Sequence, residues 1–252
     1  MTIPAPILAA AVLLAPAFAQ TPPAAPSFEV ASVKVSAMGE GKNRETIQAT
    51  PGSLSMRNIT LKSCIRWAYH VMDPQVSGPE WLNSQRYDIV GKAAGPAKED
   101  ELRPMLQTLL ASRFKLELHR ETRELSVFLL VVGKNGPKFK VSQTEGESSI
   151  EPQRKTMEVV IQRAQVSQLV DALANIFHTP VIDMTGLTGK YDITINASKY
   201  IDRQGGGSDG PPDPLALIMQ GLQEELGLKL EAKKQPVELL VIDHAEKTPT
   251  EN

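Results

Sequence analysis

The sequence predicts an α+β protein of two tandem βαββαββ-like units, in which helices pack on small mixed sheets. Some segments alternate apolar and polar residues, as half-buried strands do, and in others apolar residues recur at helical spacing. Both kinds of segment follow one another in the same order twice along the chain. Such short strands can bury their apolar faces only beneath helices, which gives an α+β layer in each unit.

The repeat is clearest in two alignments. An offset of 105 residues sets "TLKSCIRWAYHV" (60–71) against "QVSQLVDALANI" (165–176), with apolar positions in register. An offset of 104 sets Tyr87-Asp88-Ile89 against Tyr191-Asp192-Ile193. We therefore predict an internal duplication in which Tyr-Asp-Ile marks the same strand twice. Tyr and Ile would pack on the helices, and Asp would face a turn or solvent.

In the first unit, alternation predicts strands over 28–35 and 54–59, and helical spacing predicts a helix from Leu61. A strand follows over 86–93. The next helix is expected to begin near Glu101, because Pro104 is tolerated only near a first turn. The segments "KLELHRE" (115–121) and "LSVFLLVV" (125–132) would complete the unit as an antiparallel pair.

The second unit repeats this order. Its helices are expected over 166–177 and from Pro214, with Asp213 as N-cap. Its strands are expected over 157–162, 179–183 and 190–197, and two further strands, 228–234 and 237–243, are expected to close the unit. A long loop is expected over 198–213.

The first nineteen residues predict export. An apolar run ends in Ala17-Phe18-Ala19, which fits a small-x-small cleavage site, although an uncleaved anchor stays an alternative. We expect a periplasmic or extracellular protein with these boundaries: signal peptide 1–19, linker 20–27, first unit 28–140, linker 141–155, second unit 156–246 and tail 247–252.

Composition excludes several classes of partner. The net charge is −2 and no basic block occurs, so neither nucleic acid nor an anionic membrane surface is expected as partner. Cys64 is the single cysteine, which excludes an intramolecular disulfide and a multi-cysteine metal site. It lies on the apolar face of its helix, as a buried, unreactive thiol would. No apolar run after the leader reaches eighteen residues, so no membrane span is expected in the mature chain.

No residue pattern indicates catalysis, a metal or a cofactor. The sequence contains no H-E-x-x-H motif. His70 and His178 each follow a helix, where an imidazolium is favourable. His119 and Glu121 share one face of a strand, but a metal site needs three or four ligands.

The two tryptophans are the candidate binding residues. Trp67 falls off the apolar stripe of its helix, and Trp81 lies in a loop near the end of that helix. Both could cover a sheet edge or fill the contact between units. Alternatively they form an exposed patch that recognises a partner, since Trp is enriched in binding hot spots.

Two resemblances follow from longer stretches. The segments "NITLKSCIRWAY", "DMTGLTGKYDI" and "VELLVIDHAEKTPTEN" resemble a soil-bacterial (acidobacterial) family of exported proteins of unknown function. Each half also resembles the secretin/TonB-receptor N-terminal short domain; the better match covers 155–243. The first family brings no established activity. Its fusions to membrane-embedded sensor peptidases imply an extracytoplasmic sensing or docking role.

We therefore expect an exported, non-enzymatic recognition, docking or sensing protein. Sheet edges such as 125–132 would bind an envelope or extracellular protein by strand addition. One alternative is an envelope or extracellular hydrolase that uses Asp88, Asp192 or His119 in a cleft between the units. Another is a sensor that binds a small molecule in that cleft.

Overall fold

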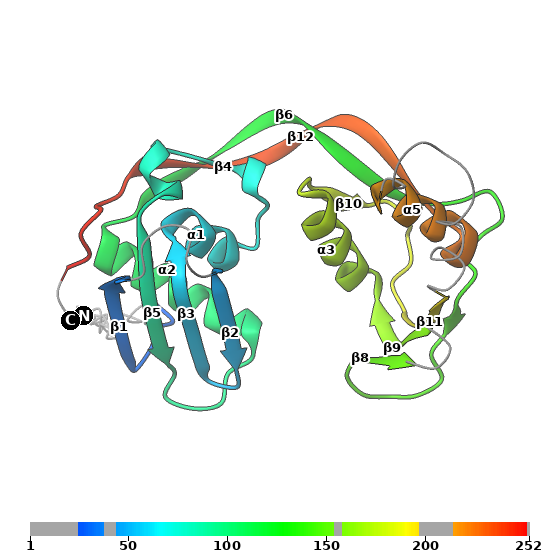
Figure 1. The fold of residues 1–252 in the computed structure, drawn as a ribbon, viewed down its shortest axis with the longest axis horizontal. Coiled ribbons are helices and arrows are strands. Elements are labelled where there is room, and N and C mark those ends of the chain that lie inside the picture. The colour runs from blue at the N-terminus through cyan, green and yellow to red at the C-terminus, as the bar shows by residue number, and fades with distance from the viewer. Residues whose placement is uncertain (1–24, 38–43, 154–157, 197–213, 251–252) are drawn as a thin grey trace, which may run out of the picture.

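The computed structural model describes residues 25–37, 44–153, 158–196 and 214–250. These residues form an α+β protein with four helices and three small sheets, which confirms the predicted fold class. Figure 1 shows two lobes joined by a long two-stranded ribbon. No helix within the described ranges has both the length and the apolar character needed to cross a membrane.

The first lobe is an antiparallel sheet of order β1-β5-β3-β2 with two helices on one face. Its strands are β1 (Val30–Val35), β2 (Thr46–Thr50), β3 (Ser53–Thr60) and β5 (Arg86–Lys92), and its helices are α1 (Leu61–Tyr69) and α2 (Glu99–Phe114). Between α1 and β5 lie the short elements η1 (Asp73–Gln75), β4 (Val76–Ser77) and η2 (Glu80–Asn83). The helix α2 begins two residues before the predicted start, and Pro104 lies inside it. Its acidic first turn explains the earlier start, because Glu101 accepts the Lys98 N–H.

The second lobe has a sheet of order β7-β11-β9-β8. Its strands are β7 (Lys140–Val141), β8 (Ser149–Gln153), β9 (Glu158–Gln165) and β11 (Lys190–Asn196). Its helices are α3 (Val166–Phe177) and α5 (Pro214–Gly221), and a π-helical turn, η4 (Leu222–Leu226), continues α5. Pro214 begins α5 as predicted, whereas Asp213 lies outside the described residues. Strand β8 falls inside 141–155, the segment that the sequence predicts as a linker, and it pairs with β9.

The ribbon corrects one prediction. The segments 115–121 and 125–132 do not form a hairpin, because both belong to the single strand β6 (Glu117–Val132). Residues 122–124 are Thr, Arg and Glu, none of which turns the chain. The predicted strands 228–234 and 237–243 likewise belong to one strand, β12 (Leu228–His244), which pairs antiparallel with β6 along its whole length. The predicted free edge at 125–132 is therefore wrong, since β12 pairs with one side and β10 (Val181–Asp183) pairs with the other at Phe128–Leu130.

As a consequence, each lobe is completed by the other half of the sequence. Leu240 and Ile242 of β12 belong to the core of the first lobe. Leu130 of β6 belongs to the core of the second lobe. The signal peptide 1–19 and the loop 198–213 lie outside the described residues, and the predicted unit boundaries stay predictions.

The Tyr-Asp-Ile triplets occupy matching positions. Tyr87 and Ile89 are fully buried, and Tyr191 and Ile193 are nearly so, as predicted. Asp88 Oδ1 accepts the backbone N–H of Asn58 at 2.8 Å. Asp192 Oδ1 accepts that of Arg163 at 3.0 Å.

Both N–H donors lie in an irregularity of the neighbouring strand. Asn58 has a φ of 51° and Arg163 a φ of 56°, and the strand register shifts beside each. The aspartates thus hold two equivalent bulges, each placed just before a helix. A duplication would produce this match, and the duplication itself stays a prediction.

Candidate functional site

Strand β2 is an edge strand of the first lobe, and among the described residues it pairs with β3 alone. The two strands are joined by the turn Pro51-Gly52, in which Gly52 has a φ of 77°. This two-residue turn makes Thr50 and Ser53 a hydrogen-bonded pair. Alternation then directs the N–H and C=O groups of Ile47 and Ala49 away from β3, toward the free edge.

A groove follows this edge. Three adjoining cavities of about 400, 590 and 580 Å³ lie along β2. The first two share Ile47, Trp67 and Glu99, and Glu99 also lines the third. The second lobe contributes three lining residues, Asp171 and Asn175 at one end of the groove and Glu147 at the other. We call this space the β2 groove; Figure 1 shows β2 on the side of the first lobe that faces the second.

Trp67 and Arg103 form one wall of the β2 groove. The Arg103 guanidinium carbon lies 4.8 Å from the centre of the Trp67 ring. Arg103 also donates to the carbonyl of Trp67 and, at 2.5 Å, to Glu99 Oε1. Gln107 Nε2 donates to the carbonyl of Ala68 at 2.8 Å. Helix α2 thereby satisfies carbonyls at the end of α1 and fixes Trp67 before any partner binds.

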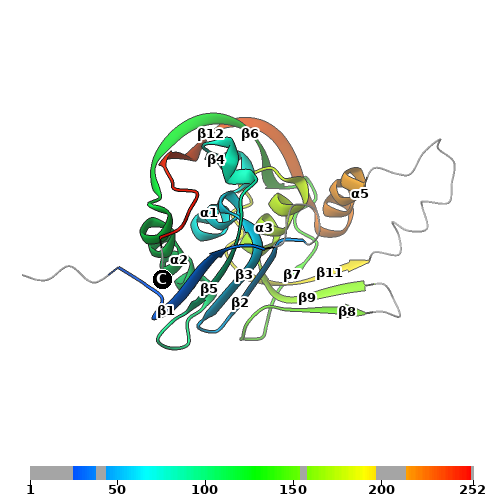
Figure 2. The same ribbon diagram turned by 60° about the vertical axis from the view of Figure 1, so that its left-hand side comes forward.

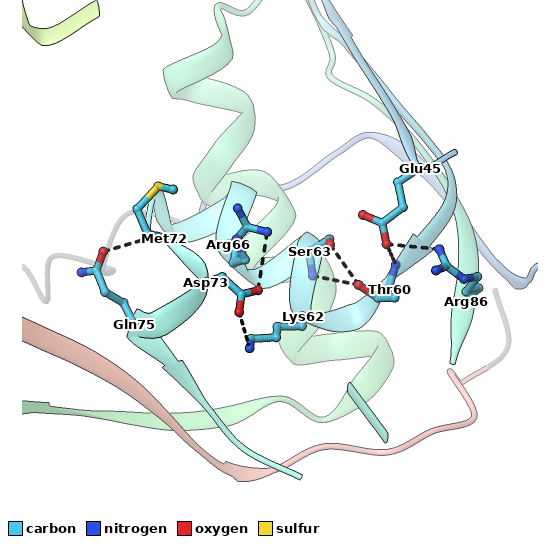
Figure 3. Close-up of polar contacts among 9 residues, drawn as sticks. All are labelled: Glu45, Thr60, Lys62, Ser63, Arg66, Met72, Asp73, Gln75 and Arg86. Carbon is cyan, nitrogen blue, oxygen red and sulfur yellow. Dashed lines mark hydrogen bonds and ion pairs between the residues drawn. The ribbon is translucent and has the colours of Figure 1, made fainter. Parts of the chain in front are cut away.

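The start of β2 is held by Glu45 (Figure 3). Glu45 Oε1 accepts the Thr60 N–H at 3.1 Å and Arg86 Nη1 at 3.2 Å. Thr60 in turn caps α1 by accepting the Ser63 N–H at 3.2 Å. The beginning of the free edge is therefore tied to the junction between β3 and α1.

Two side chains of helix α1, Lys62 and Arg66, form a charged cluster with Asp73 of η1 (Figure 3). Asp73 lies 2.9 Å from Lys62 Nζ and 3.6 Å from Arg66 Nη1. Arg66 and Met72 line the first cavity of the groove, whereas Asp73 and Lys62 do not. The cluster thus orients Arg66 at the Glu45 end.

Two polar contacts cross the groove. His70 Nε2 lies 3.0 Å from Asp171 Oδ1, and Lys98 Nζ lies 3.7 Å from Glu147 Oε1. All four side chains are largely exposed, so each pair contributes little to stability. His70 and His178 both follow a helix in the left-handed conformation, which confirms their predicted positions at helix ends.

The structure separates the two predicted binding residues. Trp67 lies in the β2 groove, whereas Trp81 lines none of the three cavities of that groove. Trp81 lies in η2, packs against the first core, and has Lys247 Nζ 5.7 Å from its ring centre. The two residues do not form one patch, and a binding role for either stays a prediction.

The residues of the hydrolase alternative are not brought together. Asp88 and Asp192 each accept a backbone N–H inside their own lobe. His119 lies on the ribbon, where its Nδ1 is 2.8 Å from Asp243 Oδ1. Glu121 bonds Arg123 instead, and this hydrogen bond lowers the pKa of the glutamate. Among the described residues, no group of three or more His, Cys, Asp or Glu side chains could hold a metal ion.

Cys64 is fully buried on α1, as predicted. Burial raises the pKa of its thiol far above the ordinary value, and the nearby Glu45 carboxylate adds to the rise. Because the thiolate is the reactive form, we expect no reaction with a thiol reagent at pH 8 in the native protein. One equivalent should react after denaturation. Rapid labelling of the native protein would contradict this.

The sequence contains a pattern that indicates β2, a strand that is not among the predicted elements. "TIQAT" (46–50) and "SLSMRN" (53–58) flank Pro51-Gly52, a turn signature between two alternating segments. This pattern indicates a hairpin and therefore an edge strand. The contributions of Asp171 and Glu147 carry no local signal, because they depend on how the lobes sit together.

A sequence model of one protein family matches residues 62–245, which is most of the chain. The chain belongs to DUF3738, a family of proteins of unknown function. The matched region of this DUF3738 protein includes Trp67, Arg103 and Asp171 but not β2. No curated protein and no solved structure matches the chain. The bacterial source and the likeness to the secretin/TonB-receptor domain stay predictions.

Proposed function

We propose that this DUF3738 protein is an exported recognition protein that binds an extended segment of an envelope or extracellular protein. The segment would add as a strand to β2. One observation carries the proposal: the free edge of β2 opens into a groove with walls from both lobes. Export rests on the N-terminal sequence pattern alone.

The dimensions of the groove suit a strand. Five residues of β2 extend over about 17 Å, and the three cavities follow that length. The backbone groups of Ile47 and Ala49 would pair with the added strand. Trp67 is already fixed by Arg103, so little conformational freedom is lost on binding.

The same walls disfavour a second copy of the chain as occupant. Edge-to-edge pairing of two β2 strands would bring a whole sheet into a space bordered by Asp171, Asn175 and Glu147. A single extended segment needs only one strand spacing, about 4.8 Å. We therefore commit to a peptide segment of another protein.

The test is selection of a displayed library of random decapeptides on the full chain. Affinities of the enriched peptides are then measured by fluorescence polarisation. Replacing Ala49 by Pro removes an N–H that points to the free edge, and an edge strand tolerates such a proline. We expect Ala49→Pro to weaken binding at least about tenfold, because main-chain pairing is the source of affinity in this mode.

Ala49→Ser is the matched control, because it keeps the N–H and should bind like the wild type. Trp67→Ala should also weaken binding, since truncated hot-spot residues typically cost more than about 1 kcal/mol. Two results would contradict the proposal: a library that yields no binder, or binders that Ala49→Pro leaves unaffected.

A further inference from the structure

We infer that the bound segment runs antiparallel to β2 and carries the pattern basic–x–apolar, with the basic residue opposite Ala49 and the apolar residue opposite Ile47. This inference rests on the proposed function. It adds the chemistry of the partner, which follows from the two ends of the β2 groove.

The first step is the face on which the side chains lie. Ile47 pairs with Met56 and Ala49 with Leu54. Met56 and Leu54 are fully buried under the helices, so Ile47 and Ala49 also lie on the helix-covered face. Residues of an added strand opposite Ile47 and Ala49 would project to that same face, into the groove. The residue between them would project to the open face and need no particular chemistry.

The second step is the apolar position. Ile47 is an exposed apolar side chain, 39% accessible, and it shares two cavities with Trp67. An apolar side chain opposite Ile47 would cover both residues. This burial contributes about 25 cal/mol for each Å² of apolar surface removed from water.

The third step is the acidic position. The cavity beside Ala49 is lined by three carboxylates, those of Glu99, Glu101 and Glu147, and by one ammonium, that of Lys98. Glu101 is engaged in capping α2, and Glu99 is paired with Arg103. Glu147 faces Lys98 at 3.7 Å with 92% of its side chain accessible, so it can turn to an incoming lysine or arginine.

The direction of the strand follows from the sheet. Every pairing in this sheet is antiparallel, and antiparallel pairs are slightly the more stable kind. Along an antiparallel segment the residue opposite Ala49 comes before the residue opposite Ile47, so basic precedes apolar. The position opposite Glu45 meets both signs of charge, from Arg66 and Asp171, and predicts no preference.

The experiment uses the peptides enriched on the full chain. We expect Lys or Arg two positions before an apolar residue in most of them. Changing that Lys to Glu should weaken binding to the wild type about two- to fivefold, the range of an exposed ion pair. Glu147→Lys should reverse this preference, so that the Glu peptide binds better than the Lys peptide.

The matched control is Glu124→Lys, which makes the same charge change on an exposed residue of the ribbon. It should leave the preference of the wild type intact. If Ala49→Pro abolishes binding while the Lys-to-Glu change has no effect, the proposed function stands and the basic–x–apolar pattern is wrong. If Glu124→Lys reverses the preference as Glu147→Lys does, general attraction explains it and the inference is also wrong.

Discussion

Residues 25–155 and residues 156–250, expressed separately, are each expected to lose cooperative folding. The first half would lack Leu240 and Ile242, which β12 supplies to its core. The loss of either side chain is comparable to a large-to-alanine change, about 2–5 kcal/mol. Together these losses approach the whole stability of an ordinary domain, about 5–15 kcal/mol. The second half would likewise lack Leu130.

The measurement is the thermal and urea unfolding of each half, monitored by circular dichroism. Mixing the halves should restore the cooperative transition, because β6 and β12 can then pair. The control is the full chain cut once between residues 143 and 147, outside every strand. That chain should stay associated and melt close to the intact protein. If either half alone unfolded with the same transition midpoint as the full chain, the lobes would not depend on the strand that each receives from the other half of the sequence.

Local sequence patterns were sufficient to predict most of the helices and strands. The helix from Leu61 begins where the spacing predicts, because Thr60 supplies the N-cap and the apolar face repeats at helical intervals. Tyr87 and Ile89 are buried where alternation places them. Burial raises the pKa of Tyr87 to about 12, with a smaller effect of Cys64, and its hydroxyl donates to the Lys247 carbonyl at 2.7 Å.

Strand pairing was beyond such patterns. Alternation shows which residues share a face, but it does not show which strand lies alongside. Two short hairpins and one long ribbon bury the same residues of β6 and β12. The two arrangements are distinguished only by residues 122–124, which are not of the types that form turns.

Only part of the candidate site could be predicted from the sequence, again because local patterns do not show which elements lie side by side. Trp67 stands out because it leaves the apolar stripe of α1, and the structure places it in the β2 groove. Asp171 reaches that groove only because the ribbon sets α3 opposite α1, as Figure 2 also shows. A contact between elements 100 residues apart leaves no periodicity in the sequence.

The exchange of strands makes a second strong prediction, which concerns where a core mutation acts. Leu240→Ala should destabilise the first lobe by about 2–5 kcal/mol, although residue 240 lies in the second half of the sequence. Leu130→Ala should destabilise the second lobe by a similar amount, although residue 130 lies in the first half.

Hydrogen exchange with mass spectrometry separates these outcomes, since it reports the opening of each segment. In Leu240→Ala, exchange should accelerate in β3, α1 and α2, while β9 and α3 keep the wild-type rates. In Leu130→Ala the pattern should be reversed. Val241→Ala is the control, because Val241 is only partly buried and belongs to neither core. If each mutation acted on its own half of the sequence, the two cores would be closed by local hairpins. The β2 groove would then lose the ribbon that holds its two walls together.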